Sequence, residues 1–161
     1  MKLSHEQLLS LVRYDQETGL FFWLKDRPNK KIGDLAGQPT SQGYWKLKLL
    51  GTFYLAHRAA WLYMNSEWPT KPIDHINGIR NDNSWKNLRQ VTSDVNRENQ
   101  RSCHRDNKSG YLGVSRTHGK NFQARIVVRG KRHHIGMFPT AEEAHHAYVL
   151  AKRQLHEGCT L

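Results

Sequence analysis

The chain has 161 residues, which allows one domain or two small ones with modest hydrophobic cores. Its formal net charge of +11 indicates a polyanionic partner such as nucleic acid, although basic surfaces also serve solubility alone. No apolar run approaches the roughly 20 residues that cross a bilayer. No signal peptide is evident, and Cys103 and Cys159 lie too far apart to suggest a disulfide framework. We therefore expect a cytoplasmic protein with no membrane partner.

Residues 1–43 are predicted to form an N-terminal extension with one helix and one strand. Apolar residues between Leu3 and Val12 recur close to helical spacing, and Ser4 with Gln7 gives the capping-box pattern of a helix start. An aromatic run from Leu20 to Leu24 predicts a strand. The remainder is rich in glycine, proline and lysine, so we expect a loop with at most one short strand.

From Tyr44 onward, alternating lysine and leucine residues predict a β-hairpin that turns at Gly51-Thr52. Its lysines should lie on one face and its leucines on the other. A helix is expected next, from His57 to Asn65, because its apolar residues can pack on that sheet. His57 itself lies in an apolar stretch, and we interpret it as a hydrogen-bonded structural histidine in preference to a catalytic one.

A polar cluster between Ile73 and Gln100 holds more oxygen ligands and amides than a folded core would bury. Such a cluster indicates a bound cation, although Asn/Asp-rich loops are often only turns. The pair Asp74 and His75 places a hard metal ligand beside a proton acceptor, a combination suited to phosphodiester hydrolysis. The members of the cluster are Asp74, His75, Asn77, Asn81, Asp82, Asn83, Asn87, Asp94, Asn96 and Asn99.

The order of these residues resembles the HNH nuclease motif, in the form found in phage and intron-encoded homing endonucleases. The dipeptide Asp74-His75 is followed by Asn87-Leu88-Arg89, and then by Asn96 within an N-x-x-N helix. The upstream segment LAHRAAWLYMNSEWP is also similar to those proteins. The resemblance covers residues 44–100, which we take as a nuclease module.

The resemblance implies a ββα-metal fold, with two antiparallel strands, a polar loop between them and a following helix. These elements are expected at residues 73–76, at residues 88–91 and from about Ser93. In an extended strand, Asp74 and His75 point to opposite sides. The pair therefore acts together only if the strand bends or a third group lies between them.

The resemblance also implies a role for each matching residue. His75 is implied as the general base, and Asn87 as the residue that orients its ring. Asp74 and Asn96 are implied as ligands of one divalent ion. We expect Mg²⁺, with Mn²⁺ as a substitute, because oxygen and amide ligands suit hard cations. The last motif position is often histidine, but the intron-type nucleases commonly have asparagine there, as at Asn96.

Residues 101–109 are predicted to be a basic linker that follows a DNA backbone, because they are polar and have no periodic apolar face. Between Arg101 and Pro139 the chain holds nine Lys or Arg residues and one acid, Asp106, for a net charge of +8. Such a stretch should bind DNA strongly and with steep salt dependence.

Residues 110–161 are predicted to form three strands and a final helix. The segments YLGVSR, NFQARIVV and KRHHIGMFP are expected to be strands, and Thr140 should cap a helix that stops at Gly158. This order resembles the AP2 DNA-binding domain, in which the sheet lies in the major groove. Leu112 and His134 depart from residues common in that family, so its base preferences do not transfer.

Alternation along the second of these strands should place Gln123, Arg125 and Val127 on one face, away from its more apolar residues. The predicted DNA contacts come from the linker, the strands and their connections. They are Arg101, Arg105, Lys108, Arg116, Lys120, Arg125, Arg129, Arg132 and His134.

These features predict an α+β protein with an N-terminal β-hairpin and helix extension, a ββα-metal nuclease module, and a C-terminal three-stranded antiparallel sheet with one helix. The expected function is site-selective, homing-type cleavage of double-stranded DNA. One site per chain predicts nicking by a monomer, with a dimer left open. The alternatives are a non-catalytic, sequence-specific DNA-binding protein that uses the AP2-like domain, and a nuclease directed at RNA.

Overall fold

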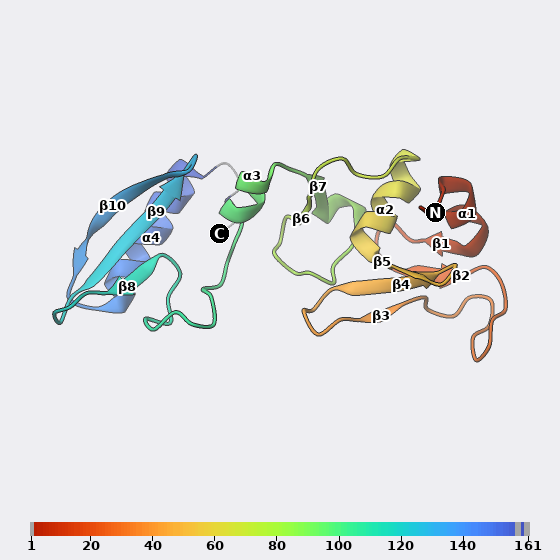
Figure 1. The fold of residues 1–161 in the computed structure, drawn as a ribbon, viewed down its shortest axis with the longest axis horizontal. Coiled ribbons are helices and arrows are strands. Elements are labelled where there is room, and N and C mark those ends of the chain that lie inside the picture. The colour runs from red at the N-terminus through yellow and green to blue at the C-terminus, as the bar shows by residue number, and fades with distance from the viewer. Residues whose placement is uncertain (1, 157–158, 160–161) are drawn as a thin grey trace. The chain divides into compact units, whose positions relative to one another are not determined.

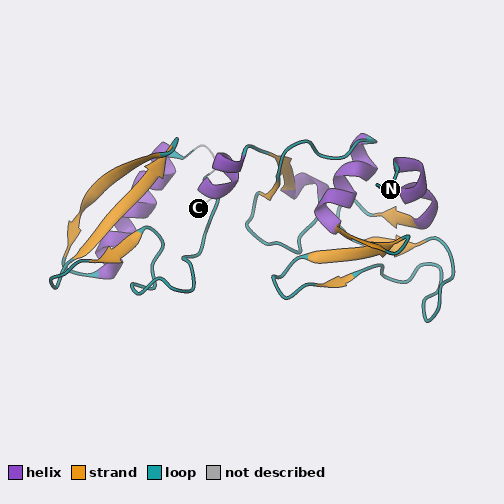
Figure 2. Ribbon diagram, in the orientation of Figure 1, coloured by secondary structure: helices purple, strands orange, loops and turns teal. Residues whose placement is uncertain are grey.

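The computed structural model describes residues 2–156 and residue 159 (Figure 1). The chain divides into two compact units, residues 1–91 and residues 92–161. The predicted nuclease module, residues 44–100, crosses this division. The described part of the chain is a mixed α and β structure with small antiparallel sheets and four α-helices (Figure 2).

The described part of the first unit contains two α-helices, one 3-10 helix and seven short strands. In chain order these elements are α1 (His5–Leu11), β1 (Val12–Tyr14), β2 (Phe21–Trp23), β3 (Gln38–Pro39), β4 (Trp45–Leu49), β5 (Thr52–Leu55), α2 (Ala56–Asn65), β6 (Ile73–His75), the 3-10 helix (Trp85–Asn87) and β7 (Leu88–Gln90). The strands form three antiparallel sheets, with the orders β1-β2, β3-β4-β5 and β6-β7.

Helix α1 begins as the sequence predicts and ends earlier. Ser4 Oγ accepts a hydrogen bond from the Gln7 N–H at 3.2 Å, and Gln7 Oε1 accepts one from the Ser4 N–H at 3.0 Å. This is the predicted capping box. Val12, whose spacing suggested a helix, instead pairs with Trp23 as the first residue of β1. Its β-branched side chain is fully buried there, so tertiary packing overrides the helical pattern.

Alternation along β4 separates a buried face from a basic face. Leu47 and Leu49 are fully buried in the core that also contains α2. Lys46 and Lys48 leave the other face, where their ammonium groups lie 4.3 and 5.7 Å from the ring centroid of Phe53. The predicted hairpin and its two faces are therefore confirmed, but the turn lies at Leu50-Gly51, one residue earlier than predicted, because Thr52 already pairs with Leu49 as the first residue of β5.

The second unit contains one antiparallel sheet and two helices in its described part. These elements are α3 (Ser93–Glu98), β8 (Val114–Arg116), β9 (Phe122–Val128), β10 (Lys131–Phe138) and α4 (Ala141–Leu155). The strand order is β10-β9-β8, and α4 lies along one face of this sheet (Figure 2). Arg129 and Gly130 make the turn between β9 and β10 with φ angles of +49° and +77°, as a two-residue hairpin turn requires.

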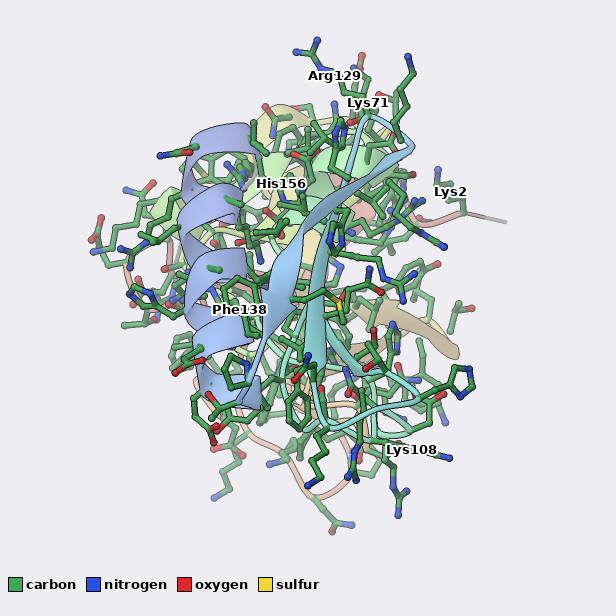
Figure 3. All side chains as sticks on the ribbon, turned by 90° about the vertical axis from the view of Figure 1, so that its left-hand side faces the viewer. Lys2, Lys71, Lys108, Arg129, Phe138 and His156 are labelled. Atoms are coloured by element: carbon green, nitrogen blue, oxygen red, sulfur yellow. The ribbon has the colours of Figure 1, made fainter. Side chains whose placement is uncertain are left out.

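The core of the second unit lies between α4 and the inner face of the sheet. Ala124 and Ile126 of β9 belong to the same buried cluster as Ala144 and Tyr148 of α4. Phe138, at the end of β10, lies between the strand and the helix (Figure 3). The remaining side chains of β9 leave the opposite face of the sheet.

Helix α4 begins at its predicted cap. Thr140 Oγ1 accepts a hydrogen bond from the Glu143 N–H at 3.2 Å. The helix ends at Leu155, and Gly158, which was predicted as its stop, lies outside the described residues. Within residues 2–156, no helix is both long enough and apolar enough to cross a membrane.

Candidate active site

Strands β6 and β7 form a short ribbon that carries the two central residues of the motif. Asp74 pairs with Arg89 across the ribbon, and His75 pairs with Leu88. Every residue of β6 is buried, with Asp74 6% exposed and His75 5% exposed. Because successive side chains leave a strand on opposite faces, the carboxylate and the imidazole meet different neighbours.

The Asp74 carboxylate is held by Arg89. Arg89 Nε and Nη2 both approach Asp74 Oδ2, at 2.9 and 2.8 Å. The Asp74 side chain is only 7% exposed, so these charge-assisted bonds offset the cost of burying its charge. A carboxylate fixed in this way has the oxygen chemistry that Mg²⁺ and Mn²⁺ prefer.

The His75 ring is hydrogen-bonded to Asn83, a residue to which the sequence assigned no separate role. Asn83 is 2% exposed, and its Oδ1 lies 3.1 Å from His75 Nε2. Asn83 Nδ2 donates to the Asn81 carbonyl at 3.2 Å, which leaves Oδ1 to face the ring. An amide oxygen only accepts hydrogen bonds, so Nε2 carries the ring proton. Nδ1 is then the ring nitrogen that can accept a proton.

Burial lowers the pKa of His75 below its ordinary value of 6.5. The hydrogen bond to Asn83 and the carboxylates of Asp74 and Asp82 act in the opposite direction, and the Arg80 cation adds to the lowering. The ring is therefore neutral at pH 7. A neutral imidazole is the form that a general base requires.

Asn87 braces the loop that follows β6. Its Oδ1 accepts a hydrogen bond from the Asn77 N–H at 2.9 Å, and its Nδ2 donates to the Asp82 carbonyl at 2.7 Å. The bond to the His75 ring that the structure shows comes from Asn83, and the predicted role of Asn87 in orienting that ring stays a prediction. Asn87 acts on the shape of the loop that carries Asn83.

Other members of the polar cluster also bond within this loop. Asp82 Oδ2 accepts a hydrogen bond from Asn77 Nδ2 at 2.6 Å, and Asp82 Oδ1 accepts one from Ser84 Oγ at 2.7 Å. Burial alone would raise the pKa of Asp82, but the bonds from Ser84 and Asn77 outweigh it and lower the pKa. These residues fit the turn interpretation of the cluster, since their polar atoms stabilise the loop.

A second histidine lies beside the first. The ring of His57, on α2, is nearly perpendicular to that of His75, with centroids 5.1 Å apart, and Tyr44 contacts both rings. Burial lowers the pKa of His57 to about 3. Its Nδ1 is buried and has no hydrogen-bond partner within the described part of the chain, so the predicted hydrogen-bonded role fails for that nitrogen. The uncharged His57 ring therefore packs against the His75 ring.

Asn96, predicted as a metal ligand, lies on α3 in the second unit, whereas Asp74, His75 and Asn87 belong to the first. The Thr92 side chain caps this helix, and Asn96 is exposed on it. Its amide oxygen is a suitable ligand for a hard cation. The ligand role of Asn96 stays a prediction.

Across residues 2–156 and 159, no group of three or more His, Cys, Asp or Glu side chains is placed to hold a metal ion. The Asp74 carboxylate alone would leave most of a coordination shell to water and phosphate oxygens. Mg²⁺ favours such sites, because it loses its waters reluctantly. This carboxylate therefore fits a divalent ion that binds together with a phosphate-bearing substrate.

Three of the nine predicted DNA contacts share one surface of the second unit. Arg125 lies on the face of β9 opposite α4, and its cross-strand partner His134 lies on the same face. Arg132 joins them as the partner of Val127. Arg125 Nη2 donates to Ser115 Oγ at 3.2 Å, which links β9 to β8 across this face. We call Arg125, Arg132 and His134 the open basic face.

The other six predicted DNA contacts are exposed elsewhere on the second unit. They are Arg101, Arg105, Lys108, Arg116, Lys120 and Arg129. Arg129 begins the β9–β10 turn, and Figure 3 shows it at the opposite end of this unit from Lys108. The structure thus distributes these cations over the unit and does not concentrate them in one cleft.

The sequence model of the HNH endonuclease family matches residues 54–101. The matched segment contains Asp74, His75, Asn87 and Asn96 together. The chain therefore carries an HNH endonuclease domain, and the prediction that it is an HNH DNA endonuclease is confirmed.

Among solved structures, the chain is similar to one described as "DNA binding and cleavage by the HNH homing endonuclease I-HmuI". The TM-score is 0.45 and the sequence identity is 19%, over 92% of this chain and 88% of that chain. No curated protein matches the chain. The class of the protein rests on the family match.

Proposed function

We propose that this protein is a site-selective DNA endonuclease of the homing type that nicks one strand of a duplex. His75 acts as the general base, and Asp74 and Asn96 hold one divalent ion. The observation that carries this proposal is the state of His75, a buried and neutral ring with its Nε2 bonded to Asn83 and a fixed carboxylate next to it in sequence.

His75 serves as the proton acceptor in this reaction. As a water oxygen bonds to phosphorus, the water loses one proton to His75 Nδ1, and one P–O bond of the backbone breaks. The leaving oxygen takes up a proton from solvent, and the imidazolium releases its proton to solvent, which returns the ring to its neutral form. Throughout, Arg89 keeps the Asp74 carboxylate in place, and Asn87 keeps the loop in shape.

When bound, the divalent ion supplies positive charge that stabilises the phosphate and the leaving oxygen in the transition state. Mg²⁺ is the expected ion, and Mn²⁺ should substitute, because carboxylate and amide oxygens suit hard cations. Asp74 would contribute a carboxylate oxygen and Asn96 an amide oxygen.

The second unit supplies most of the DNA affinity in this proposal. The open basic face lies on a three-stranded sheet with its helix on the other side, which is the arrangement that an AP2-like domain would use in the major groove. Cations elsewhere on the unit would add phosphate contacts that carry no sequence information.

Cleavage of a supercoiled plasmid tests the proposal. We expect relaxed circles with Mg²⁺ and none with EDTA. His75→Ala should still shift DNA in a gel but should relax plasmid about 10²- to 10⁴-fold more slowly, the typical contribution of a general base. His146→Ala, at an exposed position of α4, is the matched control and should cleave as the unmodified protein does.

The same assay separates the alternatives. Full activity of His75→Ala would refute its role as the base. Band shifts without relaxation under any metal would favour a protein that only binds DNA. Linear product without a relaxed intermediate would contradict nicking by a monomer, and stronger competition by RNA than by duplex DNA would favour an RNA substrate.

A further inference from the structure

Asn83 connects the His75 ring to the N-terminal segment of the chain. Its side-chain oxygen lies 3.1 Å from His75 Nε2. Its backbone carbonyl accepts a hydrogen bond at 2.6 Å from the hydroxyl of Tyr14, 69 residues earlier in the sequence. Both bonds are buried, where hydrogen bonds are electrostatically stronger than in water. The position of the ring therefore depends on a residue of β1.

The turn between β1 and β2 packs against the backbone on both sides of this carbonyl. Gly19 has a φ of +73°, and a Cβ there would lie 2.2 Å from the carbonyl carbon of Asn83 and 2.3 Å from Ser84 N. The Gln16 carbonyl accepts a hydrogen bond from the Trp85 N–H at 2.8 Å. Only glycine permits so close an approach at this φ.

Tyr14 is a fixed hydrogen-bond donor. Burial raises its pKa, and the nearby carboxylates of Asp15 and Asp82 raise it further, so the hydroxyl keeps its proton. Its ring contacts Phe21 and Tyr63 at centroid distances of 4.8 and 5.6 Å. Core packing thus aims the hydroxyl at the Asn83 carbonyl.

We propose that Asn83 selects the tautomer of His75, and that Tyr14 and Gly19 are positioning residues that hold Asn83 for this purpose. The inference rests on the proposed role of His75 as general base. Tyr14 and Gly19 lie outside the matched residues 54–101. The N-terminal extension therefore contributes to the chemistry of a nuclease domain that does not include it.

The selection has two consequences for a base that acts through Nδ1. A neutral imidazole without a fixed partner can carry its proton on either nitrogen, and the wrong tautomer presents an N–H where a proton must be accepted. The bond from Nε2 to Asn83 also strengthens as the ring gains charge, because hydrogen bonds from cations are about twice as strong as neutral ones. It therefore stabilises the transition state more than the ground state.

Substitutions at Asn83 test the selection directly in the full-length protein. Imidazole ¹⁵N NMR of the DNA-free protein should show His75 protonated on Nε2, and Asn83→Leu should give a mixture of tautomers. With supercoiled plasmid and Mg²⁺, Asn83→Leu should lower the single-turnover cleavage rate about 10²-fold and leave plasmid affinity unchanged. Asn83→Asp keeps an acceptor oxygen and should keep the Nε2-protonated tautomer.

Tyr14→Phe and Tyr54→Phe form a matched pair. Each removes a hydroxyl that bonds a backbone group, since Tyr54 Oη accepts a hydrogen bond from the Leu3 N–H at 3.2 Å. Tyr14→Phe should slow cleavage about 3- to 10-fold, the effect of one lost hydrogen bond. Tyr54→Phe should cleave as the unmodified protein does.

Gly19→Ala and Gly33→Ala form a second pair. Both glycines have positive φ, +73° and +87°, but a Cβ at Gly33 would meet nothing within 4 Å. Both substitutions therefore strain the backbone, and only Gly19→Ala also displaces Asn83. Gly19→Ala should slow cleavage and mix the tautomers of His75, whereas Gly33→Ala should do neither.

The proposal is overturned if folded Asn83→Leu keeps the Nε2-protonated ring or the original cleavage rate. If Asn83→Leu does not fold, equal cleavage rates for Tyr14→Phe and Tyr54→Phe overturn it. Failure of the general-base role is a distinct result: His75→Ala would then cleave normally, while the His75 tautomer would still respond to Asn83.

Discussion

Two antiparallel pairings in this chain use polar residues in opposite ways. In the β6–β7 ribbon every residue of β6 is buried, and its acid and its imidazole each bond a side chain of the first unit. In the β9–β10 hairpin the first four residues of β10, all basic or histidine, are exposed. The β6–β7 ribbon fixes the position and charge state of Asp74 and His75, whereas the β9–β10 hairpin exposes basic side chains to solvent.

The difference follows from what each task requires. An acid and a histidine in a buried strand cost free energy, which Arg89 and Asn83 must offset with well-formed bonds. Contact with phosphate requires only positive charge within reach, and salt screens it. Single substitutions in the ribbon should therefore lower the cleavage rate strongly. Single substitutions in the hairpin should each weaken DNA affinity only slightly.

Asp74→Asn should show the largest effect. The amide keeps the shape of the side chain but loses the charge that would bind the ion and that pairs with Arg89. We expect single-turnover cleavage to fall about 10³-fold, with a higher Mg²⁺ concentration needed for half-maximal rate. Asp106→Asn removes the same charge from an exposed site and is the control. A Mg²⁺ dependence identical to that of the original protein would contradict the ligand role of Asp74.

Asn96→Ala should have the next largest effect, because it removes one predicted ligand and leaves the carboxylate in place. We expect about a 10²-fold loss of cleavage in Mg²⁺, measured under single-turnover conditions. Asn96→His restores a metal-binding side chain and should recover part of the rate in Mn²⁺. Asn121→Ala, an exposed asparagine in the β8–β9 connection, should change nothing. Equal rates for Asn96→Ala and Asn121→Ala would exclude Asn96 as a ligand.

Arg125→Ala and Arg132→Ala should act on affinity alone. Each should weaken DNA binding about 10-fold or less at low salt and reduce the slope of log K against log salt by about one, the signature of one lost phosphate contact. Cleavage at saturating protein should not change. Arg153→Ala, on α4, removes equal charge from the helix that covers the other face of the sheet, and should have a smaller effect on the slope. A loss of cleavage at saturating protein would contradict the assignment of cleavage to the ribbon and of DNA affinity to the hairpin.

Features set by neighbouring residues could be predicted from the sequence. The Ser4 and Thr140 caps, the two faces of β4 and the strand segments of the second unit each depend on patterns within a few residues. The family match likewise follows a local motif of ordered residues. The helical prediction for Val12 was wrong, because its burial in β1 depends on pairing with Trp23, which lies outside the helical pattern.

The contact with the His75 ring could not be predicted in the same way. Asn83 and Asn87 both lie between β6 and β7, and both are buried asparagines, so composition does not distinguish them. The Tyr14 bond to Asn83 spans 69 residues, and no local pattern encodes such a pairing.

His57→Phe should give the smallest and most specific change, in the pH dependence of stability. Unfolded His57 gains a proton near its ordinary pKa of 6.5, whereas burial holds the pKa of the folded form at about 3. Between these values the unfolded state binds more protons, so the free energy of unfolding falls as pH falls. The slope from this residue approaches about 1.4 kcal/mol per pH unit, and it vanishes above pH 6.5.

Phenylalanine keeps an aromatic ring beside His75 and removes both the protonation and the unpartnered Nδ1. Urea unfolding followed by tryptophan fluorescence, from pH 4 to 7, should therefore show a shallower pH dependence for His57→Phe by about one proton. His146→Ala, which removes an exposed histidine from α4, is the control for the loss of an imidazole at the surface. If His57→Phe keeps the original slope, His57 is not a buried, uncharged ring in the folded protein. The burial of His75 must then come from Tyr44 and the loop alone.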